Sequence, residues 1–205
     1  MDTEVTRLWH QIMTVLRDQA PITAQAIRPP APSEDVEHLQ HLIGLDFPAD
    51  LRAWWTLMDG IDDQGENRTG NRVGHLLPKG FVPLSVAQAE KEYTHQLNYP
   101  AHDCCTPDGT HREKAGATGF PFCSALVPLC RNILGGLLCV DLRPGDDHGC
   151  IVEWYAAEGF YPSDWADVTD LLNEVSEGLE DYSQGLELSP YETRPFVHEG
   201  MLKWP

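Results

Sequence analysis

The chain has 205 residues, of which 32 are Asp or Glu and 14 are Lys or Arg, so its formal net charge is −18 with neutral histidine. Such a surface repels nucleic acids and anionic lipid headgroups, because proteins hold both through Lys and Arg. Hydrophobic residues make up 41% of the chain, which is enough for a packed core. We therefore expect a folded protein that binds neither nucleic acid nor membrane, while cationic partners remain open.

Three further features favour a cytoplasmic location. The best apolar run, residues 133–140, is far shorter than the roughly 18–20 residues that cross a bilayer. Asp2 stands where a secretory leader has basic residues, and no apolar segment follows it. The six cysteines are few for the length, which suits reduced, buried thiols better than a disulfide framework.

The N-terminal part of the sequence predicts three helices. Apolar residues recur at helical spacing over about residues 3–18, whereas four prolines in residues 20–32 predict an extended connector. A second helix is expected from Ser33, an N-cap type, to a stop at Gly44. A third is expected over residues 48–60, with Pro in the first turn and a left-handed glycine stop.

The middle of the chain is less regular. Residues 61–74 are polar and glycine-rich and predict an exposed loop, which is followed by short strands near Leu76 and at 81–84. Ser85 is expected to cap a helix that runs to about Leu97.

The C-terminal part predicts strands and then a helix. β-Prone runs cover residues 125–129, 137–142 and 150–155, and the last two are expected to form a hairpin. Gly135 and Gly136 indicate a bulge or a close-packing site at strand entry. An amphipathic helix is expected after a start signal at Ser163 and Asp164; its apolar stripe is Trp165, Val168, Leu171, Leu172, Val175 and Leu179.

Helices, then consecutive strands, then a helix are typical of an α+β fold, with N-terminal helices and a C-terminal amphipathic helix packed around an antiparallel-rich sheet. We divide the chain into an N-terminal helix and connector at 1–32, an α+β domain at 33–182, and a tail at 183–205 that is either docked or loose. Residues 99–121 lack apolar periodicity and are expected to be an irregular insertion.

Three segments together resemble the SUKH superfamily over roughly residues 35–180. They are FPADLRAWW at 47–55 running to Asp59-Gly60, VPL at 127–129 leading to GGLLCVDLRPG at 135–145, and SDW at 163–165. The resemblance implies an α+β fold that acts by binding proteins, as fungal cell-wall-assembly regulators and bacterial immunity proteins encoded beside toxins do. Family members often carry a Trp before the strand at 127–129, where this chain has Ala125-Leu126.

The last helix carries the most concentrated charge in the sequence. Residues 164–181 contain no Lys or Arg and seven acids: Asp164, Asp167, Asp170, Glu174, Glu177, Glu180 and Asp181. Such a run is commonly a solvated helix face. It can also steer a basic partner, such as a nuclease-like toxin, toward the protein.

Two loops and four tryptophans are further candidates for an interface. The loop acids are Asp62, Asp63 and Glu66 in one loop and Asp146 and Asp147 in the other. They fit either an interface rim or ordinary turn chemistry. The tryptophans are Trp54, Trp55, Trp154 and Trp165, for which core packing is expected, with one of each neighbouring pair available as an exposed anchor in the alternative.

A cluster of metal-ligand and nucleophile types lies in the irregular segment: His102, Cys104, Cys105, Asp108 and His111. Its spacing is wrong for a zinc site, and no phosphate-binding glycine loop exists in the sequence. We therefore expect no catalytic residue, metal or cofactor. The resemblance to the SUKH superfamily, together with the acidic helix, implies a protein-binding module of the immunity type. The alternatives are a regulatory scaffold in cell-wall or stress signalling and a small metal- or cysteine-dependent hydrolase that uses residues 99–121.

Overall fold

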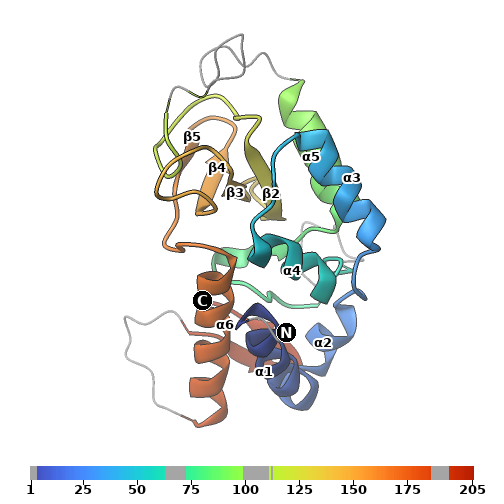
Figure 1. Ribbon diagram of the computed structural model, residues 1–205. Helices are drawn as coiled ribbons and strands as arrows, with labels where there is room; N and C mark the ends of the chain where they lie inside the picture. The colour runs from blue at the N-terminus through green and yellow to red at the C-terminus, as the bar shows by residue number, and fades with distance from the viewer. Residues whose placement is uncertain (1–3, 63–72, 99–110, 112, 186–193) are drawn as a thin grey trace.

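A computed structural model of the chain describes residues 4–62, 73–98, 111, 113–185 and 194–205. These residues form the expected α+β fold, in which helices surround an antiparallel sheet (Figure 1). The helices are α1 (Glu4–Gln19), α2 (Pro21–Ala26), α3 (Ser33–Ile43), α4 (Ala49–Leu57), α5 (Val86–Leu97) and α6 (Val168–Ser183). In this described part of the chain, no helix is long and apolar enough to cross a membrane.

The main sheet has five strands in the order of the sequence, and every neighbouring pair is antiparallel. The strands are β1 (Val82–Pro83), β2 (Leu126–Arg131), β3 (Leu137–Asp141), β4 (Ile151–Tyr155) and β5 (Gly159–Pro162). The predicted hairpin of residues 137–142 and 150–155 is confirmed by the pairing of β3 with β4. β5 was not predicted, because its four residues are bounded by Gly159 and Pro162 and contain too few positions for a period-two pattern.

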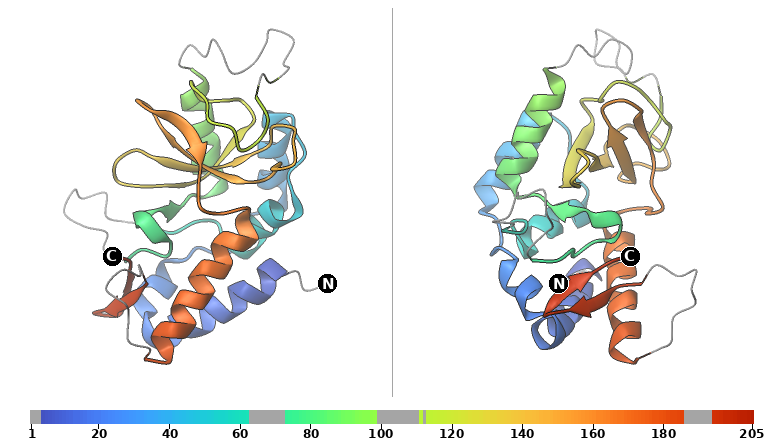
Figure 2. Two further views of the ribbon diagram at one scale, coloured as in Figure 1. Left: turned by 90° about the vertical axis from the view of Figure 1, so that its left-hand side faces the viewer. Right: turned by 180° about the vertical axis from the view of Figure 1, so that it is seen from behind.

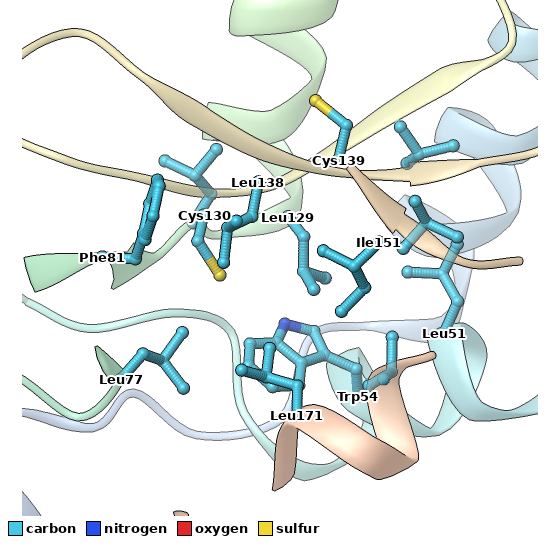
Figure 3. Close-up of a cluster of buried hydrophobic side chains, with 14 of the residues drawn as sticks. Leu51, Trp54, Leu77, Phe81, Leu129, Cys130, Leu138, Cys139, Ile151 and Leu171 are labelled. Carbon is cyan, nitrogen blue, oxygen red and sulfur yellow. The ribbon is translucent and has the colours of Figure 1, made fainter. Parts of the chain in front are cut away.

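The sheet is sandwiched between helices. α5 packs on β2, and Ser85 is its N-cap, as expected; the structure adds that Ser85 and Gln88 form a capping box. Figure 3 shows Leu138 and Ile151 pointing from the sheet toward Trp54 of α4 and Leu171 of α6, while Cys139 points to the opposite face. Since β3 and β4 are buried on both faces, their sequences are nearly continuous apolar runs.

Of the two glycines before β3, Gly136 is closely packed, whereas Gly135 has open space around it and a left-handed φ of +82°. A Cβ at Gly136 would lie 2.4 Å from the ring of Tyr155, so a larger residue would force that ring to move. The sheet irregularity lies on the opposite strand, between Pro128 and Cys130. The close-packing interpretation is therefore correct, and the bulge interpretation was placed on the wrong strand.

The extended connector expected at residues 20–32 is partly wrong, because residues 21–26 form α2. Pro21 stands in its first turn, where the missing N–H costs nothing and the fixed φ favours a helix. The predicted strand near Leu76 is also wrong; that segment leads into a 3₁₀ turn at Pro78–Gly80.

The second and third helices have different stops. Gly44 caps α3 in the left-handed conformation, as expected. α4 ends at Leu57 with an extended Met58, so Gly60 is not its cap although its φ is +76°. Gly60 instead allows close approach, because a Cβ there would lie 2.5 Å from the backbone nitrogen of Ser85.

The C-terminal residues dock on the N-terminal helices. β6 (Phe196–His198) and β7 (Met201–Lys203) form a separate hairpin that packs on α2 and lies in front of α1 in the right-hand view of Figure 2. Leu202 is fully buried; its N–H donates to Thr23 Oγ1 at 2.9 Å and its carbonyl accepts the N–H of His75 at 2.8 Å. The described end of the tail is thus docked rather than loose.

Candidate functional site

α6 presents the acidic face that the sequence predicts. Its apolar side packs on α1 and α4 and buries Val168, Leu171, Leu172, Val175 and Leu179. The acids of the helix are exposed or half-buried, as expected for the opposite side. In Figure 1 the helix runs down one side of the molecule below the sheet.

The N-terminus of α6 uses part of this acidic set for its own structure. Asp167 is the N-cap, and its Oδ1 accepts the N–H of Asp170 at 2.8 Å. Asp170 Oδ2 accepts the N–H of Ala166 at 3.0 Å, and Asp50 of α4 accepts the N–H of Val168 at 3.1 Å. These carboxylates satisfy N–H groups that the helix leaves free and favour its dipole.

Ser163 and Asp164 are therefore not the start of the helix, contrary to expectation. Ser163 is held by β4 instead: its hydroxyl donates to the carbonyl of Ile151 at 2.8 Å and accepts the N–H of Trp165 at 3.2 Å. Asp50 experiences burial and the nearby charge of Asp167, which together raise the pKa of its carboxyl above the ordinary value.

Asp164 belongs to a charge cluster around Lys79, which sequence analysis missed. The Lys79 ammonium donates to Glu153 at 2.7 Å and to Asp164 at 3.0 Å, and lies 5.2 Å from the ring centroid of Trp165. Partial burial opposes the charge of Lys79, but the two carboxylates outweigh it and raise the pKa of the ammonium. Lys79 and Glu153 are 74 residues apart, so no local pattern could have paired them.

Two more acids of the helix have partners. Glu174 accepts a hydrogen bond from the indole N–H of Trp165 at 2.5 Å, which ties the helix to the segment before it. Asp181 forms an ion pair with Arg194 of the tail, and both side chains are half-buried. Arg194 therefore neutralises one end of the acidic face.

The remaining exposed acids of the helix are Asp170, Glu177 and Glu180. Glu177 accepts a hydrogen bond from Asn173 and Glu180 accepts one from Gln184, both within the helix. Among the described residues, none of the three has an ion pair with Lys or Arg. Glu180 also borders a shallow groove of about 360 Å³ between α1 and α6, lined by His10, Gln11, Thr14, Val15, Ser176, Glu180 and Ser183.

The loop acids are distributed over different parts of the molecule. Asp62 is exposed, and its N–H donates to the carbonyl of Ala26 at the end of α2. Asp146 and Asp147 are exposed in the turn between β3 and β4. Asp63 and Glu66 lie outside the described residues.

The tryptophans are core residues. Trp54, Trp55, Trp154 and Trp165 are all at most 5% exposed, so the alternative in which one of each pair is a surface anchor is wrong. The four cysteines in the described part of the chain are also buried, and they are free thiols. Burial raises the pKa of the Cys150 thiol to about 11 and that of Cys130 and Cys139 well above the ordinary value.

The irregular segment contributes one histidine to the described structure, and His102, Cys104, Cys105 and Asp108 lie outside it. His111 Nδ1 lies 3.5 Å from Sγ of Cys123, a pair that the hydrolase alternative would need. Burial and the charge of Arg143 lower the pKa of His111, which disfavours the imidazolium that would stabilise a thiolate. Cys123 is fully buried, and the described residues contain no group of three or more metal-ligand side chains.

Sequence analysis also missed an exposed apolar pair at the turn between β2 and β3. Ile133 is 88% exposed and Leu134 is 81% exposed. Both belong to the longest apolar run, which sequence analysis used only to exclude a membrane span. The signal that could have distinguished Ile133 and Leu134 from the buried strand residues is Gly135-Gly136, which follows them. Two glycines favour a turn, and a turn there leaves the preceding pair outside the strand.

Comparison with known proteins agrees with this architecture. Residues 30–182, about three quarters of the chain, match the SMI1 / KNR4 family (SUKH-1). No curated protein matches the sequence. The match covers the segments from α3 through the sheet to α6 and includes the three motifs that carried the resemblance. The chain therefore belongs to the SMI1/KNR4 family (SUKH-1).

Proposed function

We propose that the protein is a non-enzymatic, cytoplasmic binding protein of the immunity type, which neutralises a basic, nuclease-like toxin by covering it with the acidic face of α6. The observation that carries this proposal is the exposure of Asp170, Glu177 and Glu180 without an ion pair among the described residues. Asp146 and Asp147 are candidate rim residues, since both are exposed.

Electrostatics supplies the mechanism. Exposed charges of one sign on a rigid helix attract a partner of opposite sign before contact and repel acidic proteins. A nuclease must hold phosphates with basic groups, so a carboxylate face is complementary to its substrate site. Binding there would exclude the nucleic acid, which has the same charge as the helix.

The structure shows which acids can be changed without disturbing the helix. Asp167, Asp170 and Glu174 bond to the cap or to Trp165, so their reversal would perturb folding together with charge. Glu177 and Glu180 make hydrogen bonds only within the exposed side of α6. The test variant is therefore Glu177→Lys/Glu180→Lys.

The experiment is affinity capture from lysate of the native organism with quantitative mass spectrometry. A matched control is Glu34→Lys/Glu37→Lys, which makes the same charge change at two exposed positions on α3, a helix that lies away from α6 in Figure 1. Recovery of one basic toxin by the wild type and the control, but not by the α6 variant, would support the proposal. Recovery of wall-synthesis or signalling proteins would favour the regulatory scaffold instead.

A further inference from the structure

The turn between β2 and β3 holds two aliphatic side chains in water. Ile133 and Leu134 are the most exposed large hydrophobic residues of the described chain, at 88% and 81%. Asn132 fixes their backbone: its Oδ1 accepts the N–H groups of Leu134 at 3.0 Å and Gly136 at 2.9 Å. Because the turn is already ordered, a partner that contacts it pays little entropy for ordering this backbone.

A pair of tyrosines extends this apolar turn across the sheet. Asn132 Nδ2 donates to the hydroxyl of Tyr155 at 3.1 Å, which places the turn beside β4. Tyr155 stacks on Tyr161 of β5, with ring centroids 6.3 Å apart and an interplanar angle of 10°. Both rings are half-buried, so each keeps an accessible part. We call Ile133, Leu134, Tyr155 and Tyr161 the hairpin patch.

The surroundings of the hairpin patch are anionic. Glu153 and Asp164 share the single ammonium of Lys79, so two carboxylates face one cation there. Burial raises the pKa of Tyr161; the nearby carboxylates of Glu153 and Glu158 raise it further, and the ammonium of Lys79 opposes them. Glu158 is exposed in the turn between β4 and β5.

We propose that the hairpin patch docks a cationic protein partner that presents apolar side chains flanked by Lys or Arg. This inference rests on the proposed function and adds an apolar anchor to its electrostatic surface. The charge around the patch selects the occupant: a second copy of the chain would bring another net charge of −18, and an anionic membrane would also be repelled. Tyrosine is enriched among interface anchors, and the buried core of an interface is more apolar than its polar rim.

The test is a titration of the isotopically labelled full chain with defined peptides, followed by amide NMR shifts. The first probe is a 14-residue peptide of Leu and Lys with Leu at helical spacing. The second replaces each Leu with Ser at the same charge, and the third replaces each Lys with Glu. We expect the Leu/Lys peptide to shift the amides of residues 133–135 and Tyr155, the Ser/Lys peptide to leave them unshifted, and the Leu/Glu peptide to bind at least about tenfold more weakly.

The variant Ile133→Ser/Leu134→Ser should bind the Leu/Lys peptide at least about tenfold more weakly, because it removes two aliphatic contacts. Its matched control is Leu42→Ser/Leu97→Ser, two partly exposed leucines on α3 and α5, which should bind like the wild type. Unchanged affinity of the hairpin variant, or no shift at residues 133–135 in the wild type, would overturn the inference.

A parallel titration of Glu177→Lys/Glu180→Lys separates this inference from the proposed function. Loss of affinity in the α6 variant with full affinity in the hairpin variant would overturn the hairpin patch and leave the acidic face standing. Loss in the hairpin variant alone would support the patch and count against the acidic face. Self-association of the wild type that the hairpin substitutions abolish would overturn the choice of a cationic partner.

Discussion

The cluster around Lys79 tests whether an ion pair stabilises the buried carboxylate of Glu153. Glu153 is 6% exposed and receives the Lys79 ammonium at 2.7 Å. Replacing Lys79 with Met keeps the aliphatic stem and removes the donor, so that a buried carboxylate loses its cation. We therefore expect Lys79→Met to be destabilising although Lys79 is a surface residue by exposure.

The magnitude follows from the unequal burial of the two partners. An acceptor left unsatisfied in the interior costs about 1–3 kcal/mol. The Lys79 side chain is 45% exposed, so solvent screens the pair and the lower half of that range applies, about 1–2 kcal/mol. For a chain of this length, each kcal/mol lowers Tm by roughly 2–4 °C.

The backbone of Lys79 provides an internal comparison. Its φ of +56° lies in the left-handed region, which costs a side chain about 1–2 kcal/mol and glycine nothing. Lys79→Met keeps this strain, whereas Lys79→Gly relieves it while losing the same ion pair. The glycine variant should therefore be the more stable of the two, despite having no side chain.

The assay is urea unfolding of the wild type, Lys79→Met, Glu153→Gln and the double variant, with Lys79→Gly alongside. In the Glu153→Gln background, the cost of Lys79→Met should fall below about 1 kcal/mol, because a neutral amide needs no cation. The raised pKa of Lys79 gives a second readout: its stabilisation is complete below the unfolded pKa of about 10.4 and is lost as pH rises through the folded value. Equal costs of Lys79→Met in both backgrounds would refute the reasoning.

Three other predictions concern the helix cap, the tail and the half-buried His111. Asp167→Ala should lower the free energy of unfolding in urea by about 1 kcal/mol, because it removes the N-cap of α6. Asp167→Asn keeps a hydrogen-bond acceptor and should change that free energy by only about a few tenths of a kcal/mol. Equal losses in the two variants would contradict the capping role. Leu202→Ala should lower the free energy of unfolding by about 2–5 kcal/mol, because the side chain is fully buried. Phe196→Ala in the same hairpin should be nearly neutral, because Phe196 is 42% exposed. A neutral Leu202→Ala would show that the tail is not docked. Because the pKa of His111 is lowered in the folded state, His111 does not affect the free energy of unfolding well above the unfolded pKa of about 6.5, and it destabilises the fold as pH falls below that value. His111→Gln should therefore reduce the loss of stability between pH 7 and pH 5 in thermal unfolding. A loss equal to that of the wild type would contradict the lowered pKa.

Local signals in the sequence predicted much of the fold. The apolar stripe of α1, the Ser85 capping box and the glycine stop of α3 are each encoded within a few residues, and all are present. The strands at 137–142 and 150–155 were recognisable because residues buried on both faces make continuous apolar runs. One error falls where a distant segment decides the local conformation: Ser163 is held by β4 rather than starting the helix.

The candidate site was predicted in part for the same reason. The acids of α6 could be placed on one face from their spacing, but their partners could not, since Lys79 and Arg194 come from other parts of the chain. The sequence therefore overstated the uniformity of the acidic face, which the structure divides into capping, paired and exposed carboxylates. The exposed pair Ile133 and Leu134 was hidden because an apolar run normally indicates burial.

The most direct test of the central claim is the association rate of the captured partner with the wild type and with Glu177→Lys/Glu180→Lys, measured over a range of ionic strength. Electrostatic steering predicts that the wild-type rate falls steeply with salt and that the variant associates about tenfold more slowly at low salt, with a dissociation rate that changes little. At high salt the two rates should converge, because the charges are screened. An association rate of the variant equal to that of the wild type at every ionic strength would contradict binding through the acidic face of α6.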